Sequence, residues 1–171
     1  MPLRDLESTA AARDGTPIRL RPLGPADEPL LQDLFVHMSR EDVRLRFFAA
    51  IRELSHALAG RLLNLDYDRS MAIVALQEAT PLGVARYAAE DDEKRRAEFA
   101  IAVRSDWKGR GIGYLLMTRL IEAAREAGIG ELVGVVLHEN KPMLDMCRAF
   151  GFTRAAHPGD ASLTVVRKPL G

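Results

Sequence analysis

Hydrophobic residues along the chain fall into short segments that alternate between the spacing of strands and the spacing of helices. Alternating positions over 18–23 predict a first strand, and Asp27 then precedes leucines at helical spacing, the pattern of a helix behind its N-cap. Ser39 and Ser55 each precede another segment of helical spacing, so we expect two more short helices there.

Three short hydrophobic segments follow, over 71–76, 82–89 and 98–103, with connections of hairpin length between them. This pattern predicts an antiparallel meander, because strands joined by short turns pair with their sequence neighbours. The segment 114–127 then places leucine and alanine on one stripe and is followed by Gly128, which is typical of an amphipathic helix and its C-terminus.

The last part of the chain predicts a strand, a helix and a strand. A continuous hydrophobic strand is expected over 132–137, a helix behind Asn140 that ends at Gly151, and a closing strand over 162–166. One strand–helix–strand crossover therefore follows an antiparallel start. We expect a mixed α/β (α+β) fold with a mostly antiparallel sheet of about six or seven strands and about four helices.

One folded unit is expected, because a chain of 171 residues leaves no room for a second core of ordinary size. Residues 1–17 are polar and lack a regular hydrophobic pattern, which favours a flexible N-terminal arm. Residues 18–171 then form a single domain.

Composition and charge exclude several classes of function. The 24 Lys and Arg residues balance 24 Asp and Glu residues, so no net field attracts nucleic acid or an anionic membrane. Hydrophobic runs are far too short to span a bilayer. A polar N-terminus without a hydrophobic signal segment and the single Cys147 favour a cytoplasmic protein. The four histidines lack metal-ligand spacing, so no metal is expected.

The segment 108–113, Lys-Gly-Arg-Gly-Ile-Gly, is the strongest candidate for chemistry, because it connects a predicted strand to the best predicted helix. Glycines let backbone N–H groups converge on an anion, and the helix N-terminus adds partial positive charge, so a pyrophosphate fits there. Lys108 and Arg110 add mobile positive charge at its rim. The spacing matches neither the dinucleotide motif G-x-G-x-x-G nor the P-loop, which disfavours NAD, FAD and nucleotides.

These residues resemble the GNAT superfamily of acyl-CoA-dependent N-acetyltransferases, whose signature is Gln/Arg-x-x-Gly-x-Gly/Ala after the fourth strand. Asn140 and the pair Gly151-Phe152 downstream agree with it, and the resemblance extends over about 18–166. The chain is more similar still to the acetyltransferase domain of bacterial protein-lysine acetyltransferases that modify acyl-CoA synthetases. The segments that carry this closer resemblance are Arg44 to Phe48, Asp66 to Arg69, Ala97 to Ala100 and Asp106 to Gly111.

The resemblance implies that the strand over 97–103 and the strand over 132–137 splay apart to admit acetyl-CoA. Backbone N–H groups of the glycine segment would hold the pyrophosphate, and the end of the strand over 97–103 would pair with the pantetheine arm. Asn140 would contact the cofactor. The implied cofactor-binding residues are Ile101, Ala102, Val103, Lys108, Gly109, Arg110, Gly111, Ile112, Gly113, Tyr114 and Asn140.

Two positions depart from the family pattern. Lys108 stands where the first signature residue is usually Gln or Arg, a conservative change for contact with an anion. Cys147 stands where many members have a Tyr that protonates the leaving thiolate. The role of general acid is therefore left without a residue.

Glu98 is the candidate general base, because an amine must lose a proton before it attacks and a lysine ammonium has a pKa of about 10.4. The family also places its catalytic Glu on this strand. Hydrophobic neighbours on the strand would raise the pKa of Glu98 by desolvation. The alternative is a solvent-facing Glu98 paired with Arg95 or Arg96.

Other ionisable residues have weaker support. His138 follows a strand and is the second choice for a proton relay, although it also suits a solvated loop. Asp66 and Asp68 could attract a cationic amine or simply satisfy the backbone donors of a turn. Cys147 lies on a hydrophobic helix face and is interpreted as a packing thiol.

The resemblance implies an enzyme that transfers the acetyl group of acetyl-CoA to a primary amine by direct attack in a ternary complex. The implied acceptor is a protein lysine, such as that of an acyl-CoA synthetase. Two alternatives stay open: an acetyltransferase for small-molecule amines, and a non-catalytic acyl-CoA-binding sensor domain. The sequence also leaves open whether the protein forms a homodimer.

Overall fold

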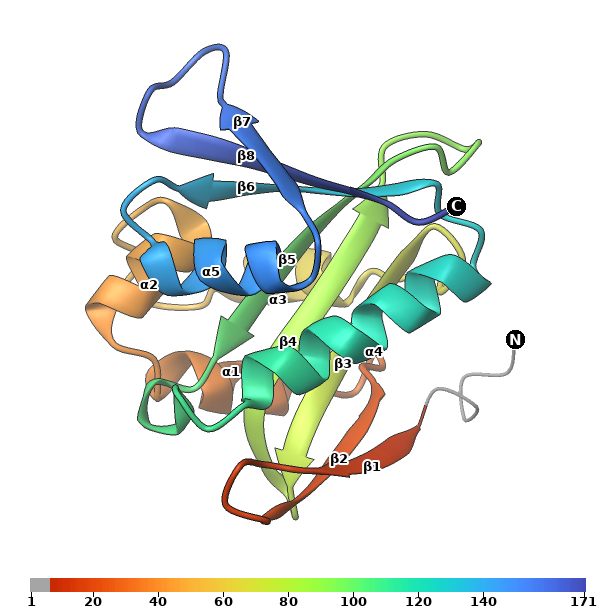
Figure 1. The fold of residues 1–171 in the computed structure, drawn as a ribbon. Helices are drawn as coiled ribbons and strands as arrows, with labels where there is room; N and C mark the ends of the chain where they lie inside the picture. Colours follow the sequence, from red (N-terminus) through yellow and green to blue (C-terminus); the bar gives the residue numbers. More distant parts are fainter. Residues whose placement is uncertain (1–6) are drawn as a thin grey trace.

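The computed structural model describes residues 7–171, and Figure 1 shows how their helices and strands are arranged. One eight-stranded sheet runs through the described chain in the spatial order β1-β2-β3-β4-β5-β6-β8-β7. The strands are β1 (Ser8–Ala11), β2 (Pro17–Pro22), β3 (Ser70–Gln77), β4 (Thr80–Ala89), β5 (Ala97–Val103), β6 (Glu131–Leu137), β7 (Thr153–Ala156) and β8 (Leu163–Pro169). The helices are α1 (Glu28–Val36), α2 (Arg40–Phe47), α3 (His56–Leu63), α4 (Ile112–Glu126) and α5 (Lys141–Ala149), with a short 3-10 turn η2 (Ser105–Trp107) before α4.

The predicted mixed α/β class is confirmed, and the sheet is mostly antiparallel. Strands β3, β4 and β5 form the expected meander, while β5 and β6 are parallel and are connected through α4. The pairing between β5 and β6 joins Ala97 to Leu132 and Glu98 to Val133. Beyond Glu98 the two strands follow different neighbours, since β6 continues along β8 and β5 continues along β4. The predicted splay between these strands is therefore present.

Helices cover both faces of this sheet, as Figure 1 shows. Alternate residues of β3 face the two layers: Ala72 and Val74 belong to the core under α1, α2 and α3, and Ile73 and Ala75 belong to the core under α4 and α5. The continuous hydrophobic run of β3 is explained by this double burial, because a strand with helices on both faces has no solvent side.

The expected flexible arm is wrong for residues 8–17, because β1 pairs antiparallel with β2 and the chain turns directly into β2. The segment Ser8–Ala11 has only small side chains, so its sequence carries no hydrophobic alternation. Backbone hydrogen bonds to the edge of β2 hold it instead. Residues 1–6 of the predicted arm lie outside the described residues.

The predicted counts of strands and helices are slightly low, and for the strands the reason is similar. Strand β7, with all four residues exposed, pairs with the edge of β8 through its backbone. An exposed strand of this kind has no hydrophobic face by which a pattern in the sequence identifies it. The described chain consequently has eight strands and five α-helices.

Helix starts follow the sequence signals at three places. The side-chain oxygens of Ser39, Ser55 and Asn140 each accept the backbone N–H three residues later, at 3.0, 3.1 and 3.4 Å. Asp27 occupies the predicted N-cap position of α1, but its carboxylate accepts the N–H of Gly24 at 2.7 Å and makes no bond to the helix. Its role is therefore to close the turn before the helix.

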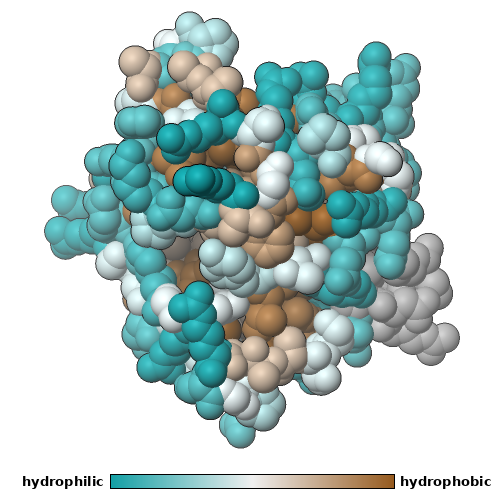
Figure 2. All heavy atoms as spheres, in the orientation of Figure 1, coloured by the Kyte–Doolittle hydropathy of each residue, from teal (hydrophilic) through white to brown (hydrophobic). Residues whose placement is uncertain are grey.

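Hydrophobic residues lie mainly in the interior. Figure 2, in the orientation of Figure 1, shows hydrophilic residues around the periphery of this face and hydrophobic ones in its central part. Among residues 7–171, no helix combines the length and the hydrophobicity that crossing a membrane requires.

Candidate functional site

A cavity of about 350 Å³ opens where β5 and β6 separate. Its walls are the end of β5, the middle of β6, the loop from η2 into α4, the start of α5, and part of α2. The lining residues include Arg13, Met38, Asp42, Leu45, Arg46, Phe99, Ala100, Ile101, Ala102, Val103, Trp107, Lys108, Gly109, Gly111, Ile112, Gly113, Tyr114, Gly134, Val135, Val136, Asn140, Pro142, Met143 and Met146.

One aromatic side chain of β5 packs against β6 in the wall of the cavity. Phe99 of β5 is 5% exposed and packs on Phe152, with ring centroids 5.2 Å apart. A Cβ built on Gly134 of β6 would lie 2.5 Å from Cε1 of Phe99, so only glycine admits this ring. The Phe99 ring therefore packs directly on the backbone of β6, next to the point where the pairing of the two strands ends.

The N-terminus of α4 faces the cavity. Its N-cap is Gly111, whose φ of 91° lies in the left-handed region, and no side chain caps the helix. Gly109 has a φ of 79° in the same region. Both glycines are therefore required by the backbone, and the first amides of α4 stay available to an anion in the cavity.

Lys108 is held by α2 and is not the mobile cation that the sequence suggested. Its Nζ lies 2.6 Å from Oδ1 of Asp42, and Ser105 Oγ donates to Oδ2 of the same carboxylate at 2.5 Å. Burial acts against the charge of Asp42, but these donors lower its pKa overall. The ion pair places a positive charge at the cavity and ties the glycine segment to α2.

Arg13 contacts the backbone of the glycine segment, and Arg110 within the segment packs on Trp107. Arg13, in the turn between β1 and β2, donates its backbone N–H to Arg110 O at 3.0 Å and its Nη1 to Gly109 O at 3.3 Å. The Arg110 guanidinium lies over the Trp107 ring, 4.4 Å from its centroid. Sequence reasoning missed Arg13, because it lies in the segment that was expected to be a flexible arm.

All the residues predicted to bind the cofactor line this cavity except Arg110. The structure thus brings together the end of β5, the glycine segment and Asn140, which are far apart in the sequence. Asn140 also accepts the N–H of Met143 and so starts α5 at the cavity wall.

Glu98 lies beside the cavity, at the last residue of β5 that pairs with β6. Its side chain is exposed, so the expected hydrophobic surroundings are wrong. The reason is strand alternation: Ala97 and Phe99 are buried under α4 and α5, and Glu98 faces the opposite side. It does not pair with Arg95 or Arg96 either, since those side chains bind other carboxylates.

Two arginines lie on the Glu98 side of the sheet, and sequence reasoning missed the second of them, Arg86. Arg46 of α2 lines the cavity, and Arg86 of β4 lies opposite Ala100 of β5. Burial lowers the pKa of Arg46 to about 10; the charge of Arg86 adds to this effect and that of Glu98 opposes it. Arg46 therefore lies within the electrostatic influence of both residues. A charged residue on a helix is usually solvated, and this placement of Arg46 depends on how α2 packs beside β5.

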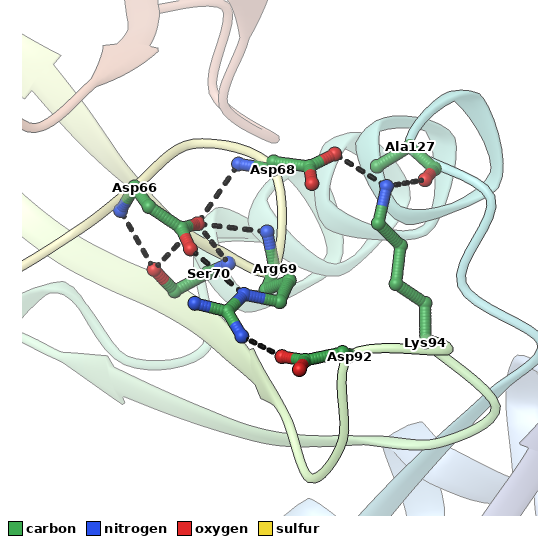
Figure 3. A network of polar contacts seen from close by, with 7 residues as sticks. All are labelled: Asp66, Asp68, Arg69, Ser70, Asp92, Lys94 and Ala127. Carbon is green, nitrogen blue, oxygen red and sulfur yellow. Dashed lines mark hydrogen bonds and ion pairs between the residues drawn. The ribbon is translucent and has the colours of Figure 1, made fainter.

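The acidic segment before β3 has a structural role, which Figure 3 shows. Asp66 accepts the backbone N–H groups of Asp68, Arg69 and Ser70 at 2.7 to 3.0 Å. These donors and the Arg69 side chain lower the pKa of Asp66 against the opposing effect of burial. Lys94 connects Asp68 to the end of α4. The turn interpretation of these aspartates is supported, and neither lines the cavity.

The remaining candidates have ordinary environments. Burial raises the pKa of the Cys147 thiol to about 12, as expected of a packing residue in the core. His138 Nδ1 lies 3.3 Å from Thr164 Oγ1, and His138 does not line the cavity. Within residues 7–171, no three His, Cys, Asp or Glu side chains form a group that could hold a metal ion.

Comparison with known proteins identifies the family of this chain. The model of the acetyltransferase (GNAT) family matches residues 33–152. Acetyltransferase PA5475 of Pseudomonas aeruginosa is 34% identical over 161 residues, which cover 92% of this chain and 86% of that protein. Acetyltransferase Pat of Mycolicibacterium smegmatis is 32% identical over 133 residues, which cover 77% of this chain but 40% of Pat. The chain thus corresponds to less than half of Pat.

Solved structures show the same fold. The GNAT domain of S. lividans PAT superposes with a TM-score of 0.91 at 24% identity, over 99% of both chains. The acetyltransferase yncA of Salmonella typhimurium, solved with acetyl-CoA, has a TM-score of 0.69 at 20% identity over 90% of this chain and 94% of its own. The chain belongs to the GNAT family of acetyltransferases and is an acetyl-CoA-dependent N-acetyltransferase.

Proposed function

We propose that this enzyme acetylates the side-chain amine of a lysine on a protein, with the cavity between β5 and β6 as its acetyl-CoA site. One observation carries the proposal: the two strands separate just beyond Glu98, around a cavity that ends at the N-terminus of α4. An uncapped helix N-terminus that suits an anion therefore lines this cavity, and a carboxylate lies beside it at the last pair of β5 and β6.

The residues that line the cavity fit acetyl-CoA. The uncapped amides of α4 and the glycines before it suit a pyrophosphate, since both supply backbone N–H groups and partial positive charge. Lys108 lies at the same place and can exchange Asp42 for a phosphate oxygen. The free edge of Ile101–Val103 suits the amides of pantetheine, and Asn140 adds a polar side chain on the opposite wall.

Acetyl-CoA supplies an activated acyl carbon, and the protein has to supply a neutral amine. At neutral pH nearly all lysine side chains are ammonium ions. In the proposal, Glu98 accepts one proton from the ammonium, directly or through one water, so that the nitrogen can attack the thioester carbonyl. A C–N bond forms, the attacking nitrogen loses its second proton to water, the C–S bond breaks, and the CoA thiolate leaves. No covalent bond to the enzyme is involved.

The proposal assigns no residue to protonation of the thiolate. Cys147, at the position where many members of the family have Tyr, is buried in the core and does not line the cavity. Its raised pKa suits packing. Since a CoA thiol has a pKa close to that of free cysteine, about 8.5, the thiolate can also take its proton from water after release.

A protein lysine is proposed as the acceptor on the basis of sequence. The segments Arg44–Phe48, 66–69, 97–100 and 106–111 resemble the lysine-acetylating branch of the family. Similarity to the two proteins named Pat supports the same branch. The first of these segments includes Arg44 and Arg46 on α2, beside the cavity, where an acceptor approaches.

Mass spectrometry with labelled acetyl-CoA tests the proposal. Purified acyl-CoA synthetases, each with a matched Lys→Arg variant at the catalytic lysine, are incubated beside a panel of small primary amines. We expect one labelled acetyl group on one lysine, absent in the matched variant. Transfer to small amines alone would replace the protein acceptor with a metabolite. Binding of acetyl-CoA without transfer to any amine would instead indicate a sensor domain.

A further inference from the structure

A second, smaller cavity of about 50 Å³ lies on the Glu98 side of the sheet, between β4, β5 and the helices α1, α2 and α3. It shares Met38, Arg46, Ala100 and Ala102 with the cofactor cavity, so the two spaces adjoin along β5. Most of its lining is hydrophobic, but two residues, Arg46 and Arg86, are arginines.

Both guanidinium groups are partly buried and fixed in place. Arg86 Nη1 donates to Leu62 O at 3.2 Å, and the Arg46 guanidinium lies over the Phe47 ring, 4.6 Å from its centroid. Within residues 7–171, neither forms an ion pair with a carboxylate, and the only carboxylate whose charge raises the pKa of Arg46 is Glu98. Two cations therefore line a mostly hydrophobic cavity without a carboxylate partner among the described residues, an arrangement that is unfavourable unless an anion joins it.

The position of the arginines points to the acceptor side of the reaction. Directly paired residues of antiparallel strands share a face, and Arg86 pairs with Ala100 while Ala88 pairs with Glu98. Arg86 and the proposed base are therefore on one face, next to each other along the sheet. The proposed path of pantetheine follows the free edge of β5, so an amine that reaches Glu98 comes from the side of the arginines.

We propose that the acceptor carries a carboxylate beside its reactive amine, and that Arg46 and Arg86 bind this carboxylate while the amine faces Glu98. The inference rests on the proposed function and specifies its substrate class. Guanidinium groups match a carboxylate because their planar N–H donors can bind both of its oxygens. The carboxylate belongs either to an Asp or Glu near the target lysine or to a small amino acid.

Two arms of one kinetic experiment distinguish these sources. In the first, peptides with a blocked N-terminus contain one free lysine and one glutamate. The glutamate is moved position by position, and each peptide is compared with its glutamine counterpart. In the second, free lysine is compared with cadaverine, the same amine without the carboxylate. Wild-type kcat/KM should favour the acidic member of one arm by about 10- to 100-fold, the range of a charge-assisted hydrogen bond.

Arg86→Gln tests whether the arginines cause this preference, because Arg86 does not line the cofactor cavity. The preference should vanish, mainly through KM of the acidic acceptor, while kcat/KM of the neutral acceptor changes less than about twofold. Arg86→Lys should restore part of it. Arg61→Gln, which removes an exposed arginine from α3, is the matched control and should retain the full preference. Equal rates for acidic and neutral acceptors in both arms, or a preference that survives in Arg86→Gln, would overturn the proposal.

A second measurement needs no turnover and separates this inference from the proposed function. Ligand-observed NMR measures glutarate binding in the presence of saturating CoA, which blocks the phosphate site. Wild type and Arg61→Gln should bind glutarate, and Arg86→Gln should bind it at least about tenfold more weakly. Absence of glutarate binding overturns the carboxylate site. Glutarate binding by a protein that acetylates no amine would retain the site and overturn the proposed function.

Discussion

At the scale of single residues, substitution of Glu98 tests the proposed chemistry most directly. The proposed base is solvent-accessible, at the last paired residue of β5. We expect Glu98→Gln to lower kcat by about 10² to 10⁴-fold, the usual contribution of a general base, because the amide cannot accept the proton. Binding of CoA should be unchanged, since Glu98 is not among the residues that line the cavity.

Steady-state kinetics and calorimetry check this prediction on the same preparations. Glu126→Gln removes an exposed carboxylate near the C-terminus of α4 and serves as the matched control, with kcat as in the wild type. An unchanged kcat in Glu98→Gln would remove Glu98 from the mechanism. If kcat of Glu98→Gln is reduced at neutral pH and recovers at higher pH, where more of the acceptor is already neutral, the proton-acceptor role of Glu98 gains support.

Asp27 shows how one carboxylate can link stability to pH. Arg21 Nη1 and Nη2 donate to its two oxygens at 2.8 and 3.0 Å. The Arg21 hydrogen bond lowers the pKa of Asp27 below 3.8, burial opposes it, and the Gly24 N–H adds to it. A lowered pKa in the folded state stabilises the protein at pH values above the unfolded pKa, and this contribution is lost as pH falls through the folded pKa.

We therefore expect Asp27→Asn to lower the free energy of unfolding by about 1 to 3 kcal/mol at pH 7, the range for a charge-assisted hydrogen bond in a partly buried pair. The difference from wild type should shrink as pH falls below 3.8. Urea denaturation at several pH values measures it. Asp145→Asn, at an exposed position of α5, is the control. A difference that stays constant through the acid range would show that the charge of Asp27 is not involved.

At the scale of secondary-structure elements, β5 and β6 pack together through a ring and a glycine, Phe99 and Gly134. In Gly134→Ala the new methyl group would overlap Phe99, and overpacking of this kind costs about 1 to 3 kcal/mol. Relief of the overlap displaces Phe99 or β6, so CoA binding should weaken as well. Denaturant unfolding and calorimetry measure the two effects.

The double variant Phe99→Leu, Gly134→Ala tests the cause, because a smaller side chain leaves room for the methyl group. The double variant should lose less free energy of unfolding than the two single variants lose in total, since the effects of residues in contact are not additive. Additive losses would show that Gly134 acts through something other than Phe99. Gly60→Ala, in an open position of α3, is expected to leave CoA binding unchanged.

At the scale of the whole molecule, the CoA site joins parts of the fold that are distant in sequence, so occupancy of the site should stabilise the entire domain. CoA at about 100 times its Kd should add about 2.7 kcal/mol to the free energy of unfolding. For a domain of this size the melting temperature then rises by about 5 to 11 °C. Scanning calorimetry checks it, with adenosine, which lacks the pyrophosphate and pantetheine, as the control. Equal shifts with both ligands would contradict binding through the helix N-terminus.

The sequence by itself determined the elements whose signals are local. Hydrophobic spacing located the meander and α4, and the glycines of 108–113 marked a backbone that needs positive φ and leaves N–H groups open. Family resemblance then linked this segment to Asn140, and both line one cavity. These features follow from residues within a few positions of one another, because turn, cap and helix signals act over that range.

Only the tertiary structure decided the surroundings of each side chain. Lys108 meets Asp42 across 66 positions of sequence, Arg46 comes from a helix onto a different face of β5 from the glycine loop, and β1 is held by a partner strand. Exposure of Glu98 was set by helices that cover the opposite face of its strand. Charge, burial and edge pairing depend on which elements pack together, and no local pattern encodes that.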